Sequence, residues 1–184
     1  LDNDGDLDLI SGSAAGQFLY WENTGSAGSP TFVARTGASN PFNGLSLAND
    51  SFVSLGDLDG DGDLDMLAGP NDGTLHYFRN DGNATTPSFA EVVGAGNPAN
   101  GIDVAFHARS LLVDFDEDGD LDLIVGAYFG EIHYFENTGT GLSPVFTERT
   151  GADNPWDGLD IGLTHSPTLG DIDGDGDLDL FSGN

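Results

Sequence analysis

The sequence Asp-x-Asp-x-Asp-Gly-Asp-Leu-Asp recurs along the chain at a fixed interval, and this recurrence constrains the fold most. Three complete copies occupy residues 57–65, 114–122 and 171–179, and residues 1–8 form a copy that lacks its leading aspartate. Each copy starts 57 residues after the previous one, with no insertion. A constant period of this length is typical of repeat architectures. The sequence therefore predicts one repeat array with units 1–57, 58–114 and 115–171 and a partial unit 172–184, expected to be an excerpt of a longer protein.

The charge of the chain is extreme and narrows the choice of partners. The formal net charge is −28, from 32 acidic residues and only 4 basic ones. Such a charge strains a compact state by self-repulsion, so bound cations are expected to stabilise the fold. It also argues against nucleic acid as a partner. No apolar run approaches the roughly 18 residues that span a bilayer, so no membrane span is expected.

Apolar alternation predicts four short strands in each unit and no helix. One strand precedes the acidic loop, a second leaves it and ends at a glycine, a third is aromatic, and a fourth follows an Asn-rich turn. The predicted strands are 52–55, 64–67, 75–78 and 88–90, with counterparts at 7–10, 18–21, 31–33, 110–113, 121–125, 132–135, 145–147, 167–169 and 178–181. The glycines are Gly12, Gly69, Gly126 and Gly183.

Four antiparallel strands per unit are typical of a β-propeller blade. The predicted fold class is therefore all-β, with tandem four-stranded antiparallel blades of β-propeller type and about three blades present. An open linear β-repeat array is the alternative. A propeller takes at least about four blades, so this chain by itself is not expected to close a ring.

The acidic loop is predicted to bind Ca²⁺, which takes six to eight oxygen ligands at about 2.3–2.6 Å. In the second unit we expect side-chain ligands from Asp57, Asp59, Asp61 and Asp65 and the backbone carbonyl of Asp63, with Gly62 allowing the sharp turn. The other predicted sets are Asp114, Asp116, Asp118, Asp120 and Asp122, then Asp171, Asp173, Asp175, Asp177 and Asp179, and finally Asp2, Asp4, Asp6 and Asp8. The last set lacks a leading aspartate and is expected to be weak or empty.

Other interpretations of the loop fit less well. A solvated acidic turn would leave five aspartates in nine residues to repel one another without compensation. A helix-loop-helix calcium site needs an acid at its twelfth position, where this chain has Ala68, Val125 and Ser182. Magnesium prefers fewer protein ligands, and zinc prefers His or Cys.

The loop and its surroundings resemble a known family. The Asp-x-Asp-x-Asp-Gly-x-x-Asp loop followed by Leu-Asp-Leu-Ile-x-Gly is similar to the FG-GAP/VCBS repeats of integrin-α-like propellers. Gly69-Pro70 and Gly126-Ala127 stand where that family has Gly-Ala-Pro, and residues 134–139 resemble bacterial secreted members. The resemblance implies calcium-loaded blades, seven in the usual ring, on extracellular adhesion or recognition proteins.

No catalytic constellation is apparent, and we expect the protein not to be an enzyme. The clustered acids are explained as metal ligands, and no phosphate-binding loop is present. His76 and His133 occupy matching positions and are interpreted as cross-strand packing. Trp21 is expected in the core. Trp156 is expected to be exposed in a turn between blades, where it would stack on a sugar or hold adjacent blades together.

These observations predict an extracellular or cell-surface calcium-binding module with a structural or adhesive role, as in a surface filament. The alternatives are a carbohydrate-binding lectin and an accessory domain of a secreted hydrolase. Besides Ca²⁺, the expected partners are other copies or neighbouring repeats and surface glycans. N-glycosylation is a further expectation at Asn49 and Asn83, which match the acceptor pattern.

Overall fold

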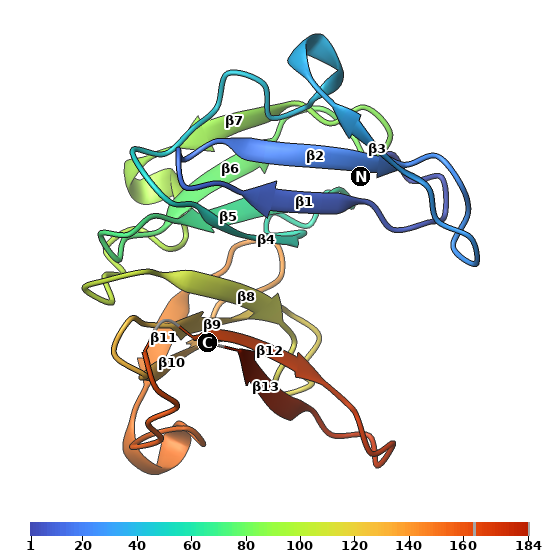
Figure 1. Cartoon of the computed structure of the whole chain (residues 1–184). Helices are drawn as coiled ribbons and strands as arrows, with labels where there is room; N and C mark the ends of the chain where they lie inside the picture. Colours follow the sequence, from blue (N-terminus) through green and yellow to red (C-terminus); the bar gives the residue numbers. More distant parts are fainter. Residues whose placement is uncertain (164, 184) are drawn as a thin grey trace.

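The structure, a computed structural model, describes residues 1–163 and 165–183 as a row of antiparallel sheets (Figure 1). Each complete sheet follows chain order, so every strand pairs with its neighbour in sequence. The first sheet has strands β1 (Leu9–Gly12), β2 (Phe18–Asn23) and β3 (Phe32–Arg35). The second has β4 (Phe52–Gly56), β5 (Asp65–Gly69), β6 (His76–Asn80) and β7 (Phe89–Val92).

The third sheet repeats the second, and the last is its first half. The third has β8 (Arg109–Val113), β9 (Asp122–Gly126), β10 (Ile132–Asn137) and β11 (Phe146–Arg149). The last pairs β12 (Ser166–Gly170) with β13 (Asp179–Gly183). The predicted all-β class with four-stranded antiparallel units is confirmed, and the second strands end at the predicted glycines.

Three short 3₁₀ helices, which the sequence analysis did not predict, follow the fourth strands. They are η1 (Gly37–Ser39), η2 (Gly94–Gly96) and η3 (Gly151–Asp153). Each starts at a glycine with positive φ, between 57° and 64°. Single turns of this kind carry no 3.6-residue apolar period, because they are too short to have a buried face.

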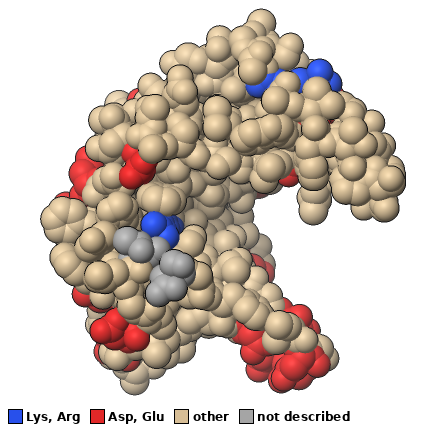
Figure 2. All heavy atoms as spheres, viewed as in Figure 1, with Lys and Arg blue, Asp and Glu red and all other residues tan. Residues whose placement is uncertain are grey.

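The sheets follow an arc that does not close. Figure 1 shows the first two sheets above the third and the half-sheet, and Figure 2 shows a wide notch on one side of the molecule. The notch separates the β2–β3 side of the first sheet from the acidic loop between β12 and β13. The described residues thus form consecutive blades without a complete ring.

The hydrophobic core is divided among the spaces between adjacent sheets. Alternate residues of one strand point to opposite faces, so β5 sends Met66 and Ala68 to the first sheet and Leu67 to the third. Strand β9 likewise directs Leu123 to the second sheet and Ile124 to the half-sheet side. These central strands are buried on both faces, which explains their nearly continuous apolar sequence.

The glycine that ends each second strand allows the next repeat to approach closely. A Cβ built on Gly69 would lie 1.9 Å from the carbonyl oxygen of Ala108, and one on Gly12 would lie 1.8 Å from that of Ser51. At Gly126 the nearest atoms belong to Pro167 and to His165, the repeat counterpart of Ala108. A side chain at these positions would separate consecutive blades.

The expected burial of both tryptophans was wrong, although Trp156 lies in a core cluster against which Leu169 and Leu180 of the half-sheet pack, as expected if it holds adjacent blades together. Trp21 is only partly buried, although its counterparts Phe78 and Phe135 are core residues. Those phenylalanines face the preceding sheet, and this chain places no described sheet against the equivalent face of the first. Trp156 is 8% exposed. Its ring lies 4.8 Å from that of Phe115, because the turn folds back into the core instead of projecting outward.

Candidate metal centre

Each acidic loop connects the first and second strands of a blade, as β4–β5, β8–β9 and β12–β13 show. The loop is shaped by left-handed residues at its fourth and sixth positions. In the second unit these are Gly60 (φ 73°) and Gly62 (φ 92°). The fourth position is Asn3 in the first unit and Glu117 in the third, both with positive φ. Glycine adopts this region without cost, whereas Glu117 does so against its Cβ.

The first three alternate aspartates of two loops converge. One carboxylate oxygen from each of Asp57, Asp59 and Asp61 lies within 4.8 Å of the others. Asp114, Asp116 and Asp118 form the same group. Oxygens that share a Ca²⁺ at about 2.3–2.6 Å lie at most about 5 Å apart, so these spacings suit one ion per loop.

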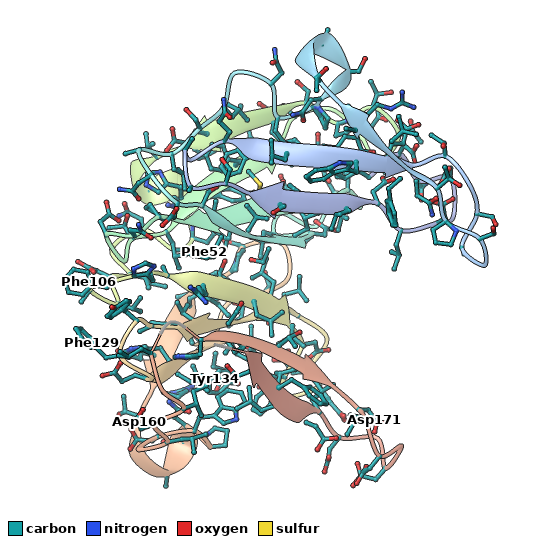
Figure 3. All side chains as sticks on the ribbon, viewed as in Figure 1. Phe52, Phe106, Phe129, Tyr134, Asp160 and Asp171 are labelled. Carbon is teal, nitrogen blue, oxygen red and sulfur yellow. The ribbon has the colours of Figure 1, made fainter. Side chains whose placement is uncertain are left out.

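The last loop groups its residues differently. There Asp171 and Asp173 converge with Asp179, the ninth residue of the motif. Asp171 lies beside the notch, across it from the first sheet (Figure 3). Within the described residues, the clipped loop with Asp2, Asp4, Asp6 and Asp8 forms no group of this kind.

Backbone amides hold the carboxylates in place. In the second loop Asp57 accepts hydrogen bonds from Gly60 N at 2.7 Å and Gly62 N at 3.0 Å. Asp59 accepts one from Asp61 N, and Asp61 accepts one from Asp63 N. The same bonds between residues i and i+2 recur in the third loop, where Asp118 N donates to Asp116 and Asp120 N donates to Asp118. The fourth loop has them as well. The loops are therefore ordered by their own backbone.

The ninth aspartate is buried and belongs to the sheet as much as to the loop. Asp65 is 1% exposed. Its Oδ2 accepts hydrogen bonds from Tyr77 OH at 2.8 Å and Leu58 N at 3.2 Å, and its Oδ1 accepts one from Asn80 N at 2.8 Å. Asp122 repeats the arrangement with its own tyrosine, Phe115 N and Asn137 N, and Asp8 uses Tyr20 and Asn23.

This arrangement shows residues that the sequence analysis missed. The Tyr77 hydroxyl donates to Asp65, the ninth aspartate, and so links it to the third strand. Asn80 N also donates to Asp65, and Asn80 links the third strand to the turn that follows. The Asn80 side chain accepts hydrogen bonds from Gly82 N and Ser88 N in the following turn. The signal was present in the sequence, because both residues recur with the 57-residue period, as Tyr20, Tyr77 and Tyr134 and as Asn23, Asn80 and Asn137.

The loops contain buried oxygens that a cation would satisfy. Oδ1 of Asp6, Asp63, Asp114 and Asp120 is buried and has no hydrogen-bond partner in the described structure. Burial and then the charges of Asp61 and Asp59 raise the pKa of Asp63. A divalent ion reverses this effect, because it favours the charged form of each carboxylate. The donor set is all oxygen, which suits Ca²⁺ and gives the residues present a good fit to that ion.

The remaining polar pairs lie on the outer strands. His76 Nδ1 lies 2.7 Å from Glu91 Oε1 on β7, and His133 Nδ1 lies 2.9 Å from Glu148 Oε1 on β11. Both histidines therefore pair with a side chain of the adjacent strand, which confirms the cross-strand role predicted for them. Arg35–Glu22 and Arg149–Glu136 are bidentate ion pairs at equivalent positions.

Comparison with known protein families agrees with this geometry. A family model described as FG-GAP-like repeat matches residues 1–68 and 114–182, well over half of the chain. A comparison with curated proteins found no relative. No helix in the described residues is long and apolar enough to cross a membrane. The matched segments contain all four acidic loops. The chain belongs to the FG-GAP-like repeat family.

Proposed function

We propose that this protein is a non-catalytic calcium-binding repeat module, in which one ion per loop stiffens the connection between the first and second strands of each blade. Asp57, Asp59 and Asp61 would bind the ion in the second blade, with Asp63 contributing through its carbonyl and its buried Oδ1. Asp65 would complete the set and transmit its position to the sheet. The third and fourth loops would use the corresponding aspartates from 114 to 122 and from 171 to 179.

The observation that carries this proposal is the convergence of carboxylates around buried oxygens without partners, repeated in successive loops. Three mutually repelling carboxylates with a fixed backbone are costly to fold unless a cation compensates them. The ion supplies positive charge and ties together groups that are otherwise separate. The FG-GAP-like repeat family is a structural repeat module, which supports a structural role for this one.

An extracellular or cell-surface setting follows from the expected affinity. Extracellular calcium modules bind with Kd values of about 10⁻⁴–10⁻³ M. At cytosolic calcium levels such sites would stay empty and the charge of −28 would remain uncompensated. We therefore place the module in an adhesion protein or surface filament, where a stiff array is useful. Neighbouring repeats or other copies are the partners proposed to extend it.

Of the two alternatives, the lectin has lost its original basis. Trp156 was its proposed sugar-stacking residue, and the buried indole cannot offer a face to a sugar. The accessory role in a secreted hydrolase is compatible with the same calcium-binding blades. The N-glycosylation proposal keeps one exposed acceptor, Asn83, whereas Asn49 is partly buried.

Calcium titration of the chelator-treated chain tests the proposal. Isothermal titration calorimetry should show Ca²⁺ binding with more than one site per chain. Asp118→Ala should remove one site and leave the others nearly unchanged, because the loops lie in separate blades. Asp153→Ala removes the same charge from an exposed residue of η3, outside the loops, and serves as the matched control. Failure to bind Ca²⁺, or equal losses in both variants, would contradict the proposal.

A further inference from the structure

Exposed aromatic rings gather where the second and third sheets meet, away from the metal loops. The aromatic cluster consists of Phe52, Phe106, His107, Tyr128 and Phe129. Figure 3 shows Phe106 and Phe129 along one edge of the molecule, on the opposite side from Asp171, and Phe52 further in, where the second and third sheets meet. Phe106 is 50% exposed and Phe129 is 54% exposed, so water covers half of each ring. Neither side chain contributes to the cores described above.

The repeat itself shows that the fold does not require these rings. At the preceding junction the positions of Phe106, His107, Tyr128 and Phe129 hold Asn49, Asp50, Asn71 and Asp72. There a polar network replaces the aromatic one. Asn71 donates through its backbone N to Asn49 Oδ1 at 2.9 Å and through Nδ2 to Asp50 Oδ2 at 2.7 Å. The repeat fold thus tolerates a fully polar junction, and the aromatic version needs another explanation.

The loop that carries Phe106 has a backbone unlike that of its counterpart. Ala105 has φ 70° and His107 has φ 53°, so both neighbours of Phe106 adopt the left-handed region. The equivalent residues of the first unit, 48 and 50, do not have positive φ. Non-glycine residues in this region are uncommon, and such outliers cluster at binding sites. Here the distortion accompanies a ring held half in solvent.

The rings of Phe106, Tyr128 and Phe129 are steeply inclined to one another, so their faces point in different directions. Phe106 and Phe129 have centroids 5.9 Å apart and planes inclined by 88°. Tyr128 is inclined by 88° to Phe129 and by 63° to Phe106. A flat sugar ring stacks best on one plane, whereas a compact cation is attracted to several ring faces at once. The geometry therefore favours a compact cation.

An acidic cavity adjoins Phe129. Its volume is about 320 Å³, and Glu131, Asp157 and Asp160 line it together with Phe129. Arg149 also lines it, and the Arg149 guanidinium is paired with Glu136. Asp160 lies close to the backbone beside Phe129, since a Cβ on Gly130 would be 2.4 Å from its Oδ1. Figure 3 shows Asp160 on the same edge as the aromatic cluster.

The cavity recurs in each unit and has the most acidic lining residues in the third. In the first unit the positions of Glu131, Asp157 and Asp160 are Gln17, Asn43 and Ser46, and these line a cavity of about 430 Å³. In the second they are Thr74, Asn100 and Asp103, which line one of about 400 Å³. The cavity with the most carboxylates is therefore the one beside the aromatic cluster. This negative charge is a property of this cavity, beyond the general acidity of the chain.

We propose that the aromatic cluster and the adjoining acidic cavity bind a soluble quaternary ammonium ion of the choline type. Such an ion suits the site because its methyl groups can lie against Phe106 and Phe129 while its charge faces the carboxylates of the cavity. A metal ion suits it less well, since ring faces offer no oxygen ligands and, within the described residues, the carboxylates of the cavity do not converge as a metal-holding group. The net charge of −28 repels anions and raises the local concentration of cations.

The positive groups of the cluster leave this site free for a cation. The Arg109 guanidinium lies over the Phe52 ring, 4.4 Å from its centroid, at the end of the cluster away from Phe129. It shows that rings of this cluster accept a cation. His107 stacks on Tyr128 at 4.9 Å, and burial lowers the pKa of His107, so its ring is neutral at pH 7.

Calorimetric titration of the calcium-saturated chain with choline chloride, at ionic strength matched with NaCl, tests this proposal. The neutral isostere 3,3-dimethylbutan-1-ol separates charge recognition from simple apolar binding. We expect choline to bind and the isostere to bind much more weakly. Phe129→Ala, which restores the residue of the first unit, should weaken choline binding by about tenfold. The double variant Glu131→Gln and Asp160→Ser, again the first-unit residues, should weaken it as well.

Phe32→Ala is the matched control, because Phe32 is 49% exposed and lies on β3 of the first sheet. Melting temperatures of all variants in Ca²⁺ establish that they are folded. Four outcomes would overturn the proposal: no choline binding, equal binding of the isostere, equal loss in Phe32→Ala, or binding only to phosphatidylcholine vesicles. Displacement of choline by a neutral methyl glycoside would do so too, because it would make the site a sugar site. Calcium affinity is measured separately, so the calcium proposal and the choline proposal can each fail without affecting the test of the other.

Discussion

Single residues in this fold have roles fixed by the repeat, and the ninth aspartate of each loop is the best example. Asp65 lies on β5 and is buried, yet three donors reach its two oxygens. A buried carboxylate is tolerated only when it is paired or hydrogen-bonded. Burial nevertheless raises the pKa of Asp65, since desolvation outweighs the hydrogen bonds in the absence of an ion. Its position between loop and sheet makes it the residue through which metal binding would stabilise the blade.

Removing the tyrosine hydroxyl should measure how much this connection contributes. Tyr77→Phe leaves the ring in the core and deprives Asp65 of one donor. Leaving a buried carboxylate oxygen short of a donor costs about 1–3 kcal/mol. We expect the free energy of unfolding from urea denaturation to fall by about this amount. Tyr128→Phe is the control, because no hydrogen bond joins the Tyr128 hydroxyl to the described residues. An equal effect in both variants would show that Asp65 does not depend on Tyr77.

His165 should make stability depend on pH. Its side chain is fully buried, its Nδ1 lies 3.2 Å from Gly162 O, and burial lowers its pKa from the ordinary value of 6.5. Below about pH 6.5 the unfolded chain takes up a proton that the folded chain resists, so stability is lost as the pH falls. His165→Ala introduces the residue found at position 108. Urea denaturation between pH 7.5 and 5 should therefore show a smaller loss in this variant, and identical profiles would contradict the assignment.

The strands and turns were largely predictable because each has a local cause. Apolar alternation located all thirteen strands within one or two residues. The limits differ in a regular way: second strands begin at the ninth aspartate of the motif, as β5 does at Asp65, and not at the leucine before it. Backbone pairing of this aspartate with the first strand, as in Gly56 with Asp65, decides the boundary. Hydrophobicity alone does not report that pairing.

The closing glycine of each second strand should be intolerant of substitution wherever another blade follows. Gly69→Ala would place a methyl group 1.9 Å from Ala108 O, so the two blades must separate. Overpacking of this kind typically costs about 1–3 kcal/mol or more. Gly183→Ala is the matched control at the same repeat position, where no described atom lies within 4 Å of the added Cβ. Thermal denaturation should show a clear loss for the first variant and little change for the second.

At the scale of the whole molecule, charge and packing oppose each other. The chain carries −28 charges, and its basic residues are four arginines, three of which form ion pairs with glutamate or aspartate. Packing between successive sheets must outweigh the repulsion among these charges. The repulsion is strongest in the acidic loops, where the aspartates are closest together. Bound Ca²⁺ would compensate the charge where it is densest, and dissolved salt would screen the remainder.

Chelation and salt should therefore act in opposite directions on stability. Removing Ca²⁺ with excess EDTA should lower Tm, because an ion bound only by the folded form contributes about 1.4 kcal/mol per site at tenfold saturation. In EDTA, raising NaCl from about 0.02 to 0.5 M should recover part of the loss, since the Debye length falls from more than 20 Å to about 4 Å. In Ca²⁺ the same salt change should matter less. An unchanged Tm on chelation would mean that the loops are stable without metal.

The sequence by itself determined the repeat, the four-stranded antiparallel unit, the positions of the acidic loops and the closing glycines. These depend on short-range patterns: alternation along a strand, glycine where φ is positive, and aspartate at every second loop position. Only the tertiary structure decided which side chains meet across blades. It buried Trp156, left Trp21 partly open, linked Asp65 to Tyr77 and Asn80, and assembled the aromatic cluster from strand β4 and two loops. Contacts of this kind depend on which sheet lies against which face, and the pattern within a single strand carries no record of its neighbour.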